Sequence, residues 1–466
     1  MAGDADTDIS HEEDRDDAQD VGLPDHFIRE IGELLSENYI DRIYEICTDL
    51  SAPDLAELLT KLGPARRHDL VGILGDSLDP EVFSYLDREI LNDLLHQMPG
   101  PQVASIVNAL ESDDAISLIT DLDEERQQDI LRHLSRKVRA AVEEGLTYDE
   151  YSAGRMMQRE FVAIPQFWTV GKTVDYLRAA ASSLPDRFYD IFVVDPLHRF
   201  AGAATLSRVL CSQRGIKIET LLDEDHVTIP VDMEQEQVAH LFRRKDLLSA
   251  PVVDEEGKLI GMITVDDIVD VIDEAAEEDI LRMGGLSDSD IHRSTVATAR
   301  ARSWWLAVNL VTAVLASVVI SFFEESIVKI VALATLMPIV ASMGGNAGTQ
   351  TLTVVIRALA TKELSSSNTW RMVAKEFAVG SINGFLFALL MGSLVWWWYD
   401  DATLAFVIAA AMIINLMAAG LSGIVIPVTL DRMGMDPAPS AGVLLTTVTD
   451  VVGFLAFLGL ATWLLI

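Results

Sequence analysis

The sequence predicts a multidomain membrane protein, with an α-helical superhelical N-domain, a tandem α/β pair and an all-α transmembrane bundle of five helices. Half of the 466 residues are hydrophobic, although the formal net charge is -37. These two facts are compatible because Asp and Glu dominate up to about residue 290 and long apolar runs follow. A pattern of 19 residues also recurs at an offset of 59 residues. A chain of this length is expected to form several domains.

The charge excludes one class of partner, because a strongly acidic surface repels the phosphates of nucleic acid. It suits divalent cations or a very salty cytosol. The chain has nine Lys against 26 Arg, and acidic, lysine-poor surfaces resemble those of salt-in halophilic archaea. An ordinary acidic mesophilic protein is the alternative. The two cysteines, Cys47 and Cys211, imply neither a disulfide framework nor a cysteine metal site.

The N-terminal part divides into a tail and a helical domain. Residues 1–24 are acidic, without the apolar core of a signal peptide, and should be disordered in the cytosol. Residues 25–150 contain short amphipathic units that end at Pro, Gly or an acidic turn. Leu58–Leu59 and Leu94–Leu95 occupy equivalent places in two of these units. Short helices that cannot bury a face alone tend to stack into a superhelix.

An internal duplication follows. The run FVVDPLHRFAGAATLSRVL begins at Phe192, and the run PVVDEEGKLIGMITVDDIV begins at Pro251. The two runs align with each other without a gap. Each copy is typical of a strand, a tight turn, a second strand and a helix. The pattern resembles a pair of CBS domains, which we place at residues 151–213 and 214–278; an unrelated α/β repeat is the alternative. Residues 279–302 then predict a connecting helix.

Residues 303–466 form the membrane part. Each apolar segment reaches the roughly 20 residues that span a bilayer. The segments lie near residues 304–323, 328–359, 377–399, 402–430 and 441–466. Basic residues flank one set of their ends, including Arg300 and Arg357, whereas Glu324 and Asp400 lie at the other. The excess of basic residues on cytoplasmic loops puts the N-terminal domains in the cytosol and Ile466 outside.

Asp450, in the run TTVTDVVGF, is the one ionisable residue that we expect deep within a span. A charge there costs at least about 2.5–3.5 kcal/mol, so the residue is a candidate functional site. Thr446, Thr447 and Thr449 lie within a turn of it. A protonated carboxyl that only fixes helix packing is the alternative.

A second polar stretch interrupts the apolar run of residues 338–360. Gly344, Gly345 and Gly348 allow close approach of the backbone, although small-residue helix packing would also use them. Oxygen-bearing side chains follow at Asn346, Thr349, Gln350, Thr351 and Thr353. Oxygen ligands without Cys or His indicate a hard cation, and Mg2+ prefers carboxylates that contact it through retained waters.

Four motifs carry a family resemblance: GGNAGTQ at 344–350, IRALAT at 356–361, MGMDPA at 433–438 and TTVTDVVGF at 446–454. They resemble the MgtE family of magnesium channels, over nearly the whole chain. The resemblance implies a homodimer in the cell membrane, in contact with lipid, with a cytosolic sensor and a pore at the subunit interface. Its transported ion and regulator would be Mg2+.

The resemblance also implies roles for single residues. Asp450 would hold hydrated Mg2+, Asp436 would lie at the cytosolic mouth, and residues 281–298 would be the plug helix. The implied pore-lining residues are Gly345, Asn346, Gly348, Thr349, Thr353, Thr446 and Thr449. Gly442–Val443 departs from the family pattern, so a side-chain ligand expected there is missing.

Regulatory ligands follow from the same resemblance. They are Glu234, Glu236, Asp246, Asp267, Asp270, Glu278 and Asp279, with Asp113 and Asp114 as weaker candidates; solvated surface charge is the alternative for each. Arg243 departs from a position that is small or neutral in the family. The second copy has Thr264 with Asp267, whereas the first has Thr205 with Arg208, so ATP binding at the pair is in doubt.

The predicted function is a Mg2+-selective channel that admits Mg2+ down its electrochemical gradient and closes when cytosolic Mg2+ is plentiful. The alternatives are a secondary exchanger that couples Mg2+ to Na+, a broader permease for Co2+ and Mn2+, and a membrane-anchored CBS sensor. We find neither a nucleophile–base constellation nor a Gly-rich phosphate loop with Lys, so an enzyme is not expected.

Overall fold

The structure is a computed structural model that describes residues 22–120, 122–185, 187–223, 227–286, 295–364 and 368–466. The predicted acidic tail lies outside the described residues up to position 21. The chain forms two compact units, one up to Glu274 and one from Ala275 onward. The division falls within helix α14 (Val265–Met283).

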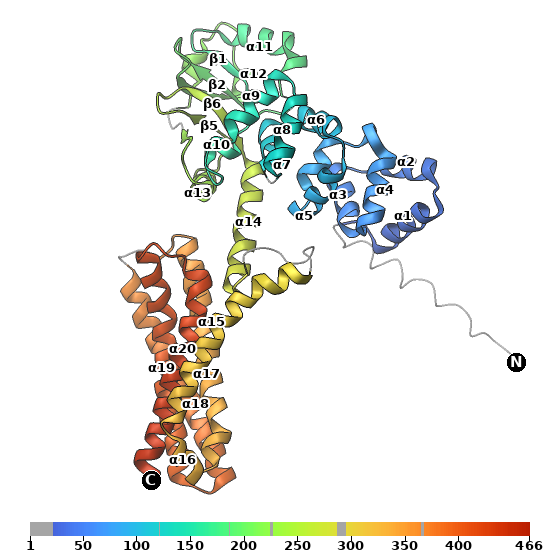
Figure 1. The fold of residues 1–466 in the computed structure, drawn as a ribbon. Helices are drawn as coiled ribbons and strands as arrows, with labels where there is room; N and C mark the ends of the chain where they lie inside the picture. Colours follow the sequence, from blue (N-terminus) through green and yellow to red (C-terminus); the bar gives the residue numbers. More distant parts are fainter. Residues whose placement is uncertain (1–21, 121, 186, 224–226, 287–294, 365–367) are drawn as a thin grey trace, which may run out of the picture. The chain divides into compact units, whose positions relative to one another are not determined.

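The first unit begins with a stack of short helices (Figure 1). Isolated helices of this length are marginal in water, so they are stabilised by a shared core. Leu58, Leu59, Leu94 and Leu95 are fully buried in that core, which confirms the predicted equivalence of the paired leucines. The helices are α1 (Asp25–Glu37), α2 (Ile40–Cys47), α3 (Ala52–Lys61), α4 (Pro64–Leu74), α5 (Arg88–Gln97), α6 (Gly100–Ala109), α7 (Ser112–Thr120), α8 (Glu124–His133) and α9 (Arg136–Gly145), with 3-10 turns at Gly75–Ser77 and Pro80–Tyr85.

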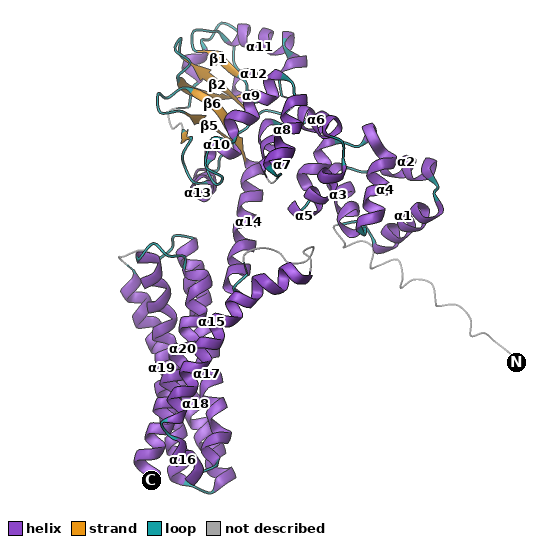
Figure 2. Ribbon diagram, viewed as in Figure 1, coloured by secondary structure: helices purple, strands orange, loops and turns teal. Residues whose placement is uncertain are grey.

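Two small sheets follow, each with helices beside it (Figure 2). In both, the first strand is parallel to the second, and the second is antiparallel to the third. The first repeat contains α10 (Ala153–Met156), β1 (Ala163–Pro165), α11 (Val170–Ala179), β2 (Asp190–Val194), β3 (Phe200–Thr205) and α12 (Leu206–Leu210). The second contains β4 (Ile229–Pro230), α13 (Gln235–Lys245), β5 (Ser249–Val253), β6 (Leu259–Thr264) and α14.

The strand register confirms the duplication. Asp190 pairs with Thr205 in the first sheet, and Ser249 pairs with Thr264 in the second. The same irregularity falls after Val193 and after Val252. The repeats also face one another, because the Ser249 hydroxyl donates to Asp190 Oδ2 over 2.7 Å. The two repeats are therefore one pseudo-symmetric module.

The cores of the two repeats reach across the boundary predicted between residues 213 and 214. Ile218 and Leu221 are buried in the core of the first repeat, with Ile164 and Ile191. Conversely, Ala153 near the start of the module packs in the core of the second repeat. Each repeat thus completes its core with a segment beyond the duplicated strands, which the internal alignment did not cover.

The second unit contains the membrane helices (Figure 1). Four are long and apolar enough to cross a membrane, namely α15 (Thr295–Ser321), α18 (Thr369–Tyr399), α19 (Ala402–Arg432) and α20 (Pro437–Leu465). A fifth long helix, α17 (Ala332–Ala360), contains the polar glycine-rich stretch, which lowers its mean hydropathy. It packs against α19 and α20 within the bundle, so the prediction of five spans holds. The short helix α16 (Glu324–Lys329) precedes α17.

Two boundaries of this unit differ from the sequence prediction. Helix α18 begins at Thr369, eight residues before the apolar run at 377, because a helix continues through polar residues when its other face packs. The connecting segment is divided: α14 ends at Met283, and Gly285 follows with φ 75°. Such a backbone favours glycine and ends the helix. Residues 287–294 of the predicted plug helix lie outside the described residues.

Candidate functional site

Helix α20 presents a polar face around Asp450. Thr446 lies one helical turn before Asp450 and is exposed, and Asp450 is half-buried. The Thr446 hydroxyl donates to Gly442 O over 2.9 Å, which leaves its lone pairs free to accept. Thr449 is fully buried and its hydroxyl donates to Thr446 O. Thr449 therefore does not lie on the accessible face of this chain, whereas Thr446 and Asp450 do.

Helix α17 also has exposed polar side chains. Thr349 and Thr353 are exposed, and their hydroxyls donate to the backbone oxygens of Gly345 and Thr349, each over 2.9 Å. Asn346 is exposed as well. Gly348 is different, because it is buried and a Cβ there would lie 2.8 Å from a methyl group of Leu445. Gly348, which was predicted to line the pore, is therefore not on the accessible face of this chain. Its lack of a side chain lets α17 and α20 pack closely.

The start of α20 forms a charged cluster with the end of α14, which we call the mouth cluster: Glu278, Asp279, Arg282 and Asp436. Asp436 caps α20 by accepting from the Ala438 amide over 2.9 Å, and Arg282 Nη1 donates to its other oxygen over 2.7 Å. Arg282 also pairs with Glu278. Burial raises the pKa of Asp279, and the charge of Asp436 raises it further. Three predicted ligands are thus together, around an arginine that the prediction did not include.

A second acidic cluster lies in the first unit, where α7 and α14 begin. Burial raises the pKa of Asp113 well above its usual value, and the charges of Asp267 and Asp114 add to this. Burial likewise raises the pKa of Glu111 to about 7 and that of Asp267 to about 6. The cluster, called the sensor cluster here, comprises Glu81, Glu111, Asp113, Asp114, Asp266, Asp267 and Asp270.

The negative charges of the sensor cluster repel one another, and a bound cation would reduce that repulsion. Like charges in a partly desolvated place disfavour one another's ionised form. Asp113 Oδ1 is buried and has no hydrogen-bond partner among the described residues. Nowhere in the described ranges do three or more His, Cys, Asp or Glu lie close enough to hold a bare metal ion. Any cation at this cluster would therefore have to keep water in its coordination shell, as Mg2+ commonly does.

The remaining predicted regulatory residues lie elsewhere. Glu234 is the residue before α13 and is exposed, and its carboxylate accepts from the Gln237 side chain over 2.7 Å. Glu236 is in the first turn of α13, and Asp246 ends that helix with φ 52°. Asp113 and Asp114, which the sequence made only weak candidates, belong to the sensor cluster instead. In the sequence, Asp113 and Asp114 could have been singled out because they stand just before the apolar residues of α7.

The residues relevant to nucleotide binding are partly engaged within the module. The Thr264 hydroxyl donates to Asp267 Oδ2 over 2.7 Å. In the first repeat, the equivalent position is Arg208, which pairs with Asp223 over 2.8 Å. The two copies therefore present opposite charges at this position.

Glu376 is a membrane carboxylate that the sequence prediction missed. It lies in α18, is only 8% exposed, and accepts from the Thr351 hydroxyl of α17 over 3.0 Å. Asp450 is therefore not the one carboxylate within the membrane helices. The reason is the predicted span, which began at 377, one residue too late to include Glu376. The helical spacing of Glu376 with Gly380 and Asn383 was the available signal.

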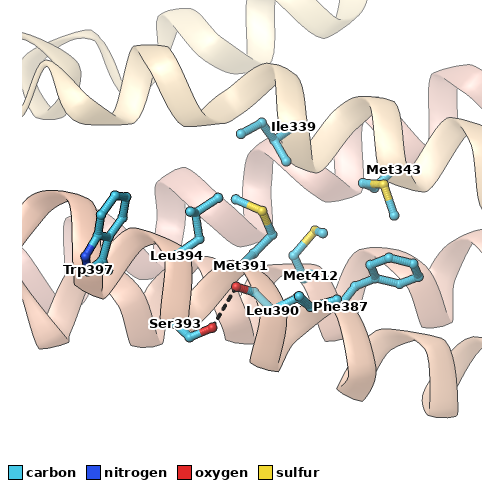
Figure 3. Close-up of a pocket in the computed structure, with 9 residues that line it drawn as sticks. All are labelled: Ile339, Met343, Phe387, Leu390, Met391, Ser393, Leu394, Trp397 and Met412. Carbon is cyan, nitrogen blue, oxygen red and sulfur yellow. Dashed lines mark hydrogen bonds between the residues drawn. The ribbon is translucent and has the colours of Figure 1, made fainter.

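A cavity of about 520 Å3 lies between α17, α18 and α19 (Figure 3). Its lining is methionine-rich and apolar, with Ser393 as the polar exception, and the Ser393 hydroxyl donates to Leu390 O over 2.9 Å. No charged side chain lines it. The cavity therefore suits a hydrocarbon chain and not a cation.

Three family models match the chain. They are the divalent cation transporter model MgtE at residues 337–460, the MgtE intracellular N domain at residues 50–151, and the CBS domain at residues 218–274. The first covers α17 to α20, with both polar faces. The second covers most of the helical stack, and the third covers the second α/β repeat.

Curated relatives extend the similarity over nearly the full length. The magnesium transporter MgtE of Bacillus subtilis is 30% identical over 444 residues, covering 94% of this chain and 97% of its own. That of Thermus thermophilus is 32% identical over 440 residues, covering 93% and 97%. A crystal structure of the cytosolic domain of the Mg2+ channel MgtE in complex with ATP is 30% identical with a TM-score of 0.49, covering 52% of this chain and 99% of that one.

Proposed function

Because the chain belongs to the MgtE family of divalent cation transporters, we propose that it conducts Mg2+ across the membrane into the cytosol, down the electrochemical gradient. An inside-negative potential favours a divalent cation by about 4.6 kcal/mol per 100 mV, twice the figure for a single charge. Entry therefore needs no energy-coupling chemistry.

The observation that carries this proposal is the accessible polar face around Asp450. Asp450 and Thr446 lie on α20, and Thr349 and Thr353 lie on α17, all with some exposure in a single chain. In the part of the chain that the structure describes, no basic side chain is paired with Asp450. Hydrocarbon does not tolerate such a face, so it must border water or protein.

A second copy of the chain supplies the covering that this face needs. Two copies related by a two-fold axis would bring two Asp450 carboxylates to one water-filled path. Two carboxylates balance the charge of one divalent cation, and the threonine hydroxyls hydrogen-bond the waters that Mg2+ retains. We therefore propose a homodimer with the ion on its axis.

Regulation is proposed to use α14, which carries acids of both clusters. Asp267 lies in its first turn, and Glu278, Asp279 and Arg282 lie in its last turns. Cytosolic Mg2+ would neutralise the sensor cluster and hold α7 against α14. At the other end, Asp436 and Arg282 tie α14 to the first residue of α20. Mg2+ bound by the sensor cluster would thereby favour a closed pore.

Flux through reconstituted protein tests the proposal. Proteoliposomes with a Mg2+ indicator inside should fill with Mg2+ under an inside-negative potential, with equal Na+ on both sides. A requirement for a Na+ gradient would support the exchanger instead. Flux of Co2+ and Mn2+ at rates similar to Mg2+ would support the broader permease, and a membrane without flux of any of these ions would leave only a sensor.

Topology gives an independent prediction. A reporter fused after Ile466 should lie outside the cell, and one inserted after Leu364 should lie inside. The reason is the odd number of spans and the basic residues on one set of helix ends, such as Arg357 and Arg371. Cysteine accessibility at the two positions in whole cells would measure this. A C-terminus that is labelled only after lysis would contradict the orientation.

The sensor cluster predicts a pH dependence. Five of its acids, Glu111, Asp113, Asp114, Asp267 and Asp270, have raised pKa values in the folded chain, about 7 for Glu111 and about 6 for Asp267. Unfolded acids titrate near 4, so without Mg2+ the α7–α14 contact should be weakened as pH rises from about 4 to about 7. Mg2+ competes with protons for these carboxylates, so it should bind more tightly as pH rises over the same range.

Limited proteolysis of the full-length protein would measure that dependence. Without Mg2+, cleavage should be faster at about pH 8 than at about pH 5.5, and added Mg2+ should protect strongly only at the higher pH. The Glu111→Gln variant should flatten the profile, whereas Glu234→Gln, on the surface of α13, should not. Protection by Mg2+ that is equal at both pH values would contradict the role of the cluster.

A further inference from the structure

The membrane unit contains a polar cavity on the side of α17 away from its exposed threonines. The cavity has a volume of about 170 Å3 and lies between α17, α18 and α19. Its polar lining comes from Gln350 and Thr351 of α17 and from Glu376 and Asn383 of α18. Successive residues of a helix are about 100° apart, so Thr351 faces away from Thr349 and Thr353. The cavity therefore lies on another side of α17 than Thr349 and Thr353, and Gln350 lies at its rim between the two sides.

Glu376 is the one charged residue in that lining. It is 8% exposed, and the Thr351 hydroxyl donates to its Oε2 over 3.0 Å. Glu376 forms no ion pair with any Lys, Arg or His in the described ranges. A buried carboxylate without a compensating charge is unfavourable by several kcal/mol. A bound cation would supply the positive charge that this lining lacks.

The surrounding backbone is built to leave room at this place. Gly420 of α19 lies against Glu376, because a Cβ at Gly420 would be 2.9 Å from the Glu376 carbonyl oxygen. A Cβ at Gly380 of α18 would similarly be 2.8 Å from Leu416 O of α19. The two glycines thus let the backbones of α18 and α19 approach closely, and both line the cavity together with Glu376 and Asn383. Gln350 at the rim is exposed, so the cavity opens to the surface of the bundle.

The charge and the donor set decide which ion fits. One carboxylate balances one positive charge, whereas a divalent cation would leave an uncompensated positive charge in a desolvated place. Hydroxyl and amide oxygens of Thr351, Gln350 and Asn383 supply neutral donors, as a hard cation requires. The absence of sulfur and imidazole from the lining excludes preference for a softer metal.

We propose that Glu376, Thr351, Gln350 and Asn383 form a binding site for an alkali-metal cation, Na+ or K+, within the membrane unit of each copy of the chain. Because α17 carries this site on one side and Thr349 and Thr353 on the other, occupancy would fix the position of that polar face. The inference does not rest on the proposed Mg2+ conduction, since it concerns binding to a different set of residues.

Thermal stability of the full-length protein in detergent tests the site without any measurement of flux. At constant ionic strength and pH, with N-methylglucamine as the replaced ion, Na+ or K+ should raise the Tm of the wild type by a few degrees, because a ligand of the folded state stabilises it. The ion that gives the larger rise identifies the occupant. Glu376→Gln keeps the size and the bond from Thr351 but should lose the rise. Glu363→Gln, in the exposed segment that follows α17, is the matched control and should keep it.

A second variant and a direct measurement keep the test decisive if Glu376→Gln folds poorly. Thr351→Val leaves the charge but removes one donor, so it should weaken binding of 22Na+ or 86Rb+ several-fold while the bound ion stays at about one per copy. Equal Tm values in Na+, K+ and N-methylglucamine for the wild type would overturn the proposal, since Glu376 would then only pack against α17 and α19.

Discussion

Replacement of Asp450 by asparagine should reduce Mg2+ flux to that of empty liposomes while leaving a folded protein in the membrane. Asparagine keeps the size of the side chain but removes both negative charges from the axis of the proposed dimer. Losing about 3 kcal/mol of charge interaction at a desolvated place corresponds to roughly a hundredfold, and here two such charges are lost together. Indicator-loaded proteoliposomes under an inside-negative potential would measure the effect.

Two further variants make that result specific. Asp450→Glu should retain part of the flux, because the charge remains although its distance from the axis changes. Asp400→Asn is the matched control: Asp400 is exposed between α18 and α19 with φ 51°, a conformation that asparagine tolerates, so its flux should equal that of the wild type. Wild-type flux in the Asp450→Asn protein would refute the assignment of the pore.

Neutralising the sensor cluster should produce a channel that conducts at high cytosolic Mg2+. The variant Asp113→Asn, Asp114→Asn, Asp267→Asn removes the charges that draw regulatory ions to the α7–α14 contact. A shift from mostly open to mostly closed requires the bound ions to favour the closed state by about 5.5 kcal/mol, which several weak sites must supply together. The single variants should therefore shift the Mg2+ dependence, and the triple variant should lose it.

Patch recording with cytosolic Mg2+ stepped from micromolar to tens of millimolar would test this. The matched control replaces Glu234, Glu236 and Asp246, the acids at the ends of α13, and it should close like the wild type. High salt sharpens the interpretation: at about 1 M the Debye length is roughly 3 Å, so only direct contact with the carboxylates would survive. Closure of the sensor variant at wild-type Mg2+ would show that the cluster is ordinary surface charge.

The two clusters also show which of the predicted ligands the fold brings together and which it keeps apart. Asp436, Glu278 and Asp279 were predicted as ligands and do lie together, but Arg282 already neutralises part of that charge. Glu234 and Asp246 were predicted with equal weight, yet they remain separate on the surface of α13. An acidic chain offers many carboxylates, and only packing selects those that share a desolvated place.

The sequence by itself determined the architecture of this protein, because the signals for it are local. Hydropathy runs of bilayer length predicted the membrane helices. The repeat from Phe192 and from Pro251 predicted two copies of a strand, a turn, a second strand and a helix, and the structure pairs the strands of both copies in the same register. Asp450 was found because a carboxylate in an apolar run is conspicuous. Each of these inferences needs only neighbours along the chain.

Tertiary structure alone decided which distant residues meet. Thr351 and Glu376 join α17 to α18, Asp113 approaches Asp267 from another domain, and Arg282 reaches Asp436 across 154 positions. The face that a helical residue presents depends on its packing partners, and no local pattern encodes them. Helix packing therefore buried Gly348 and Thr449 and left Thr349 and Thr446 accessible, although all four had been predicted to line the pore.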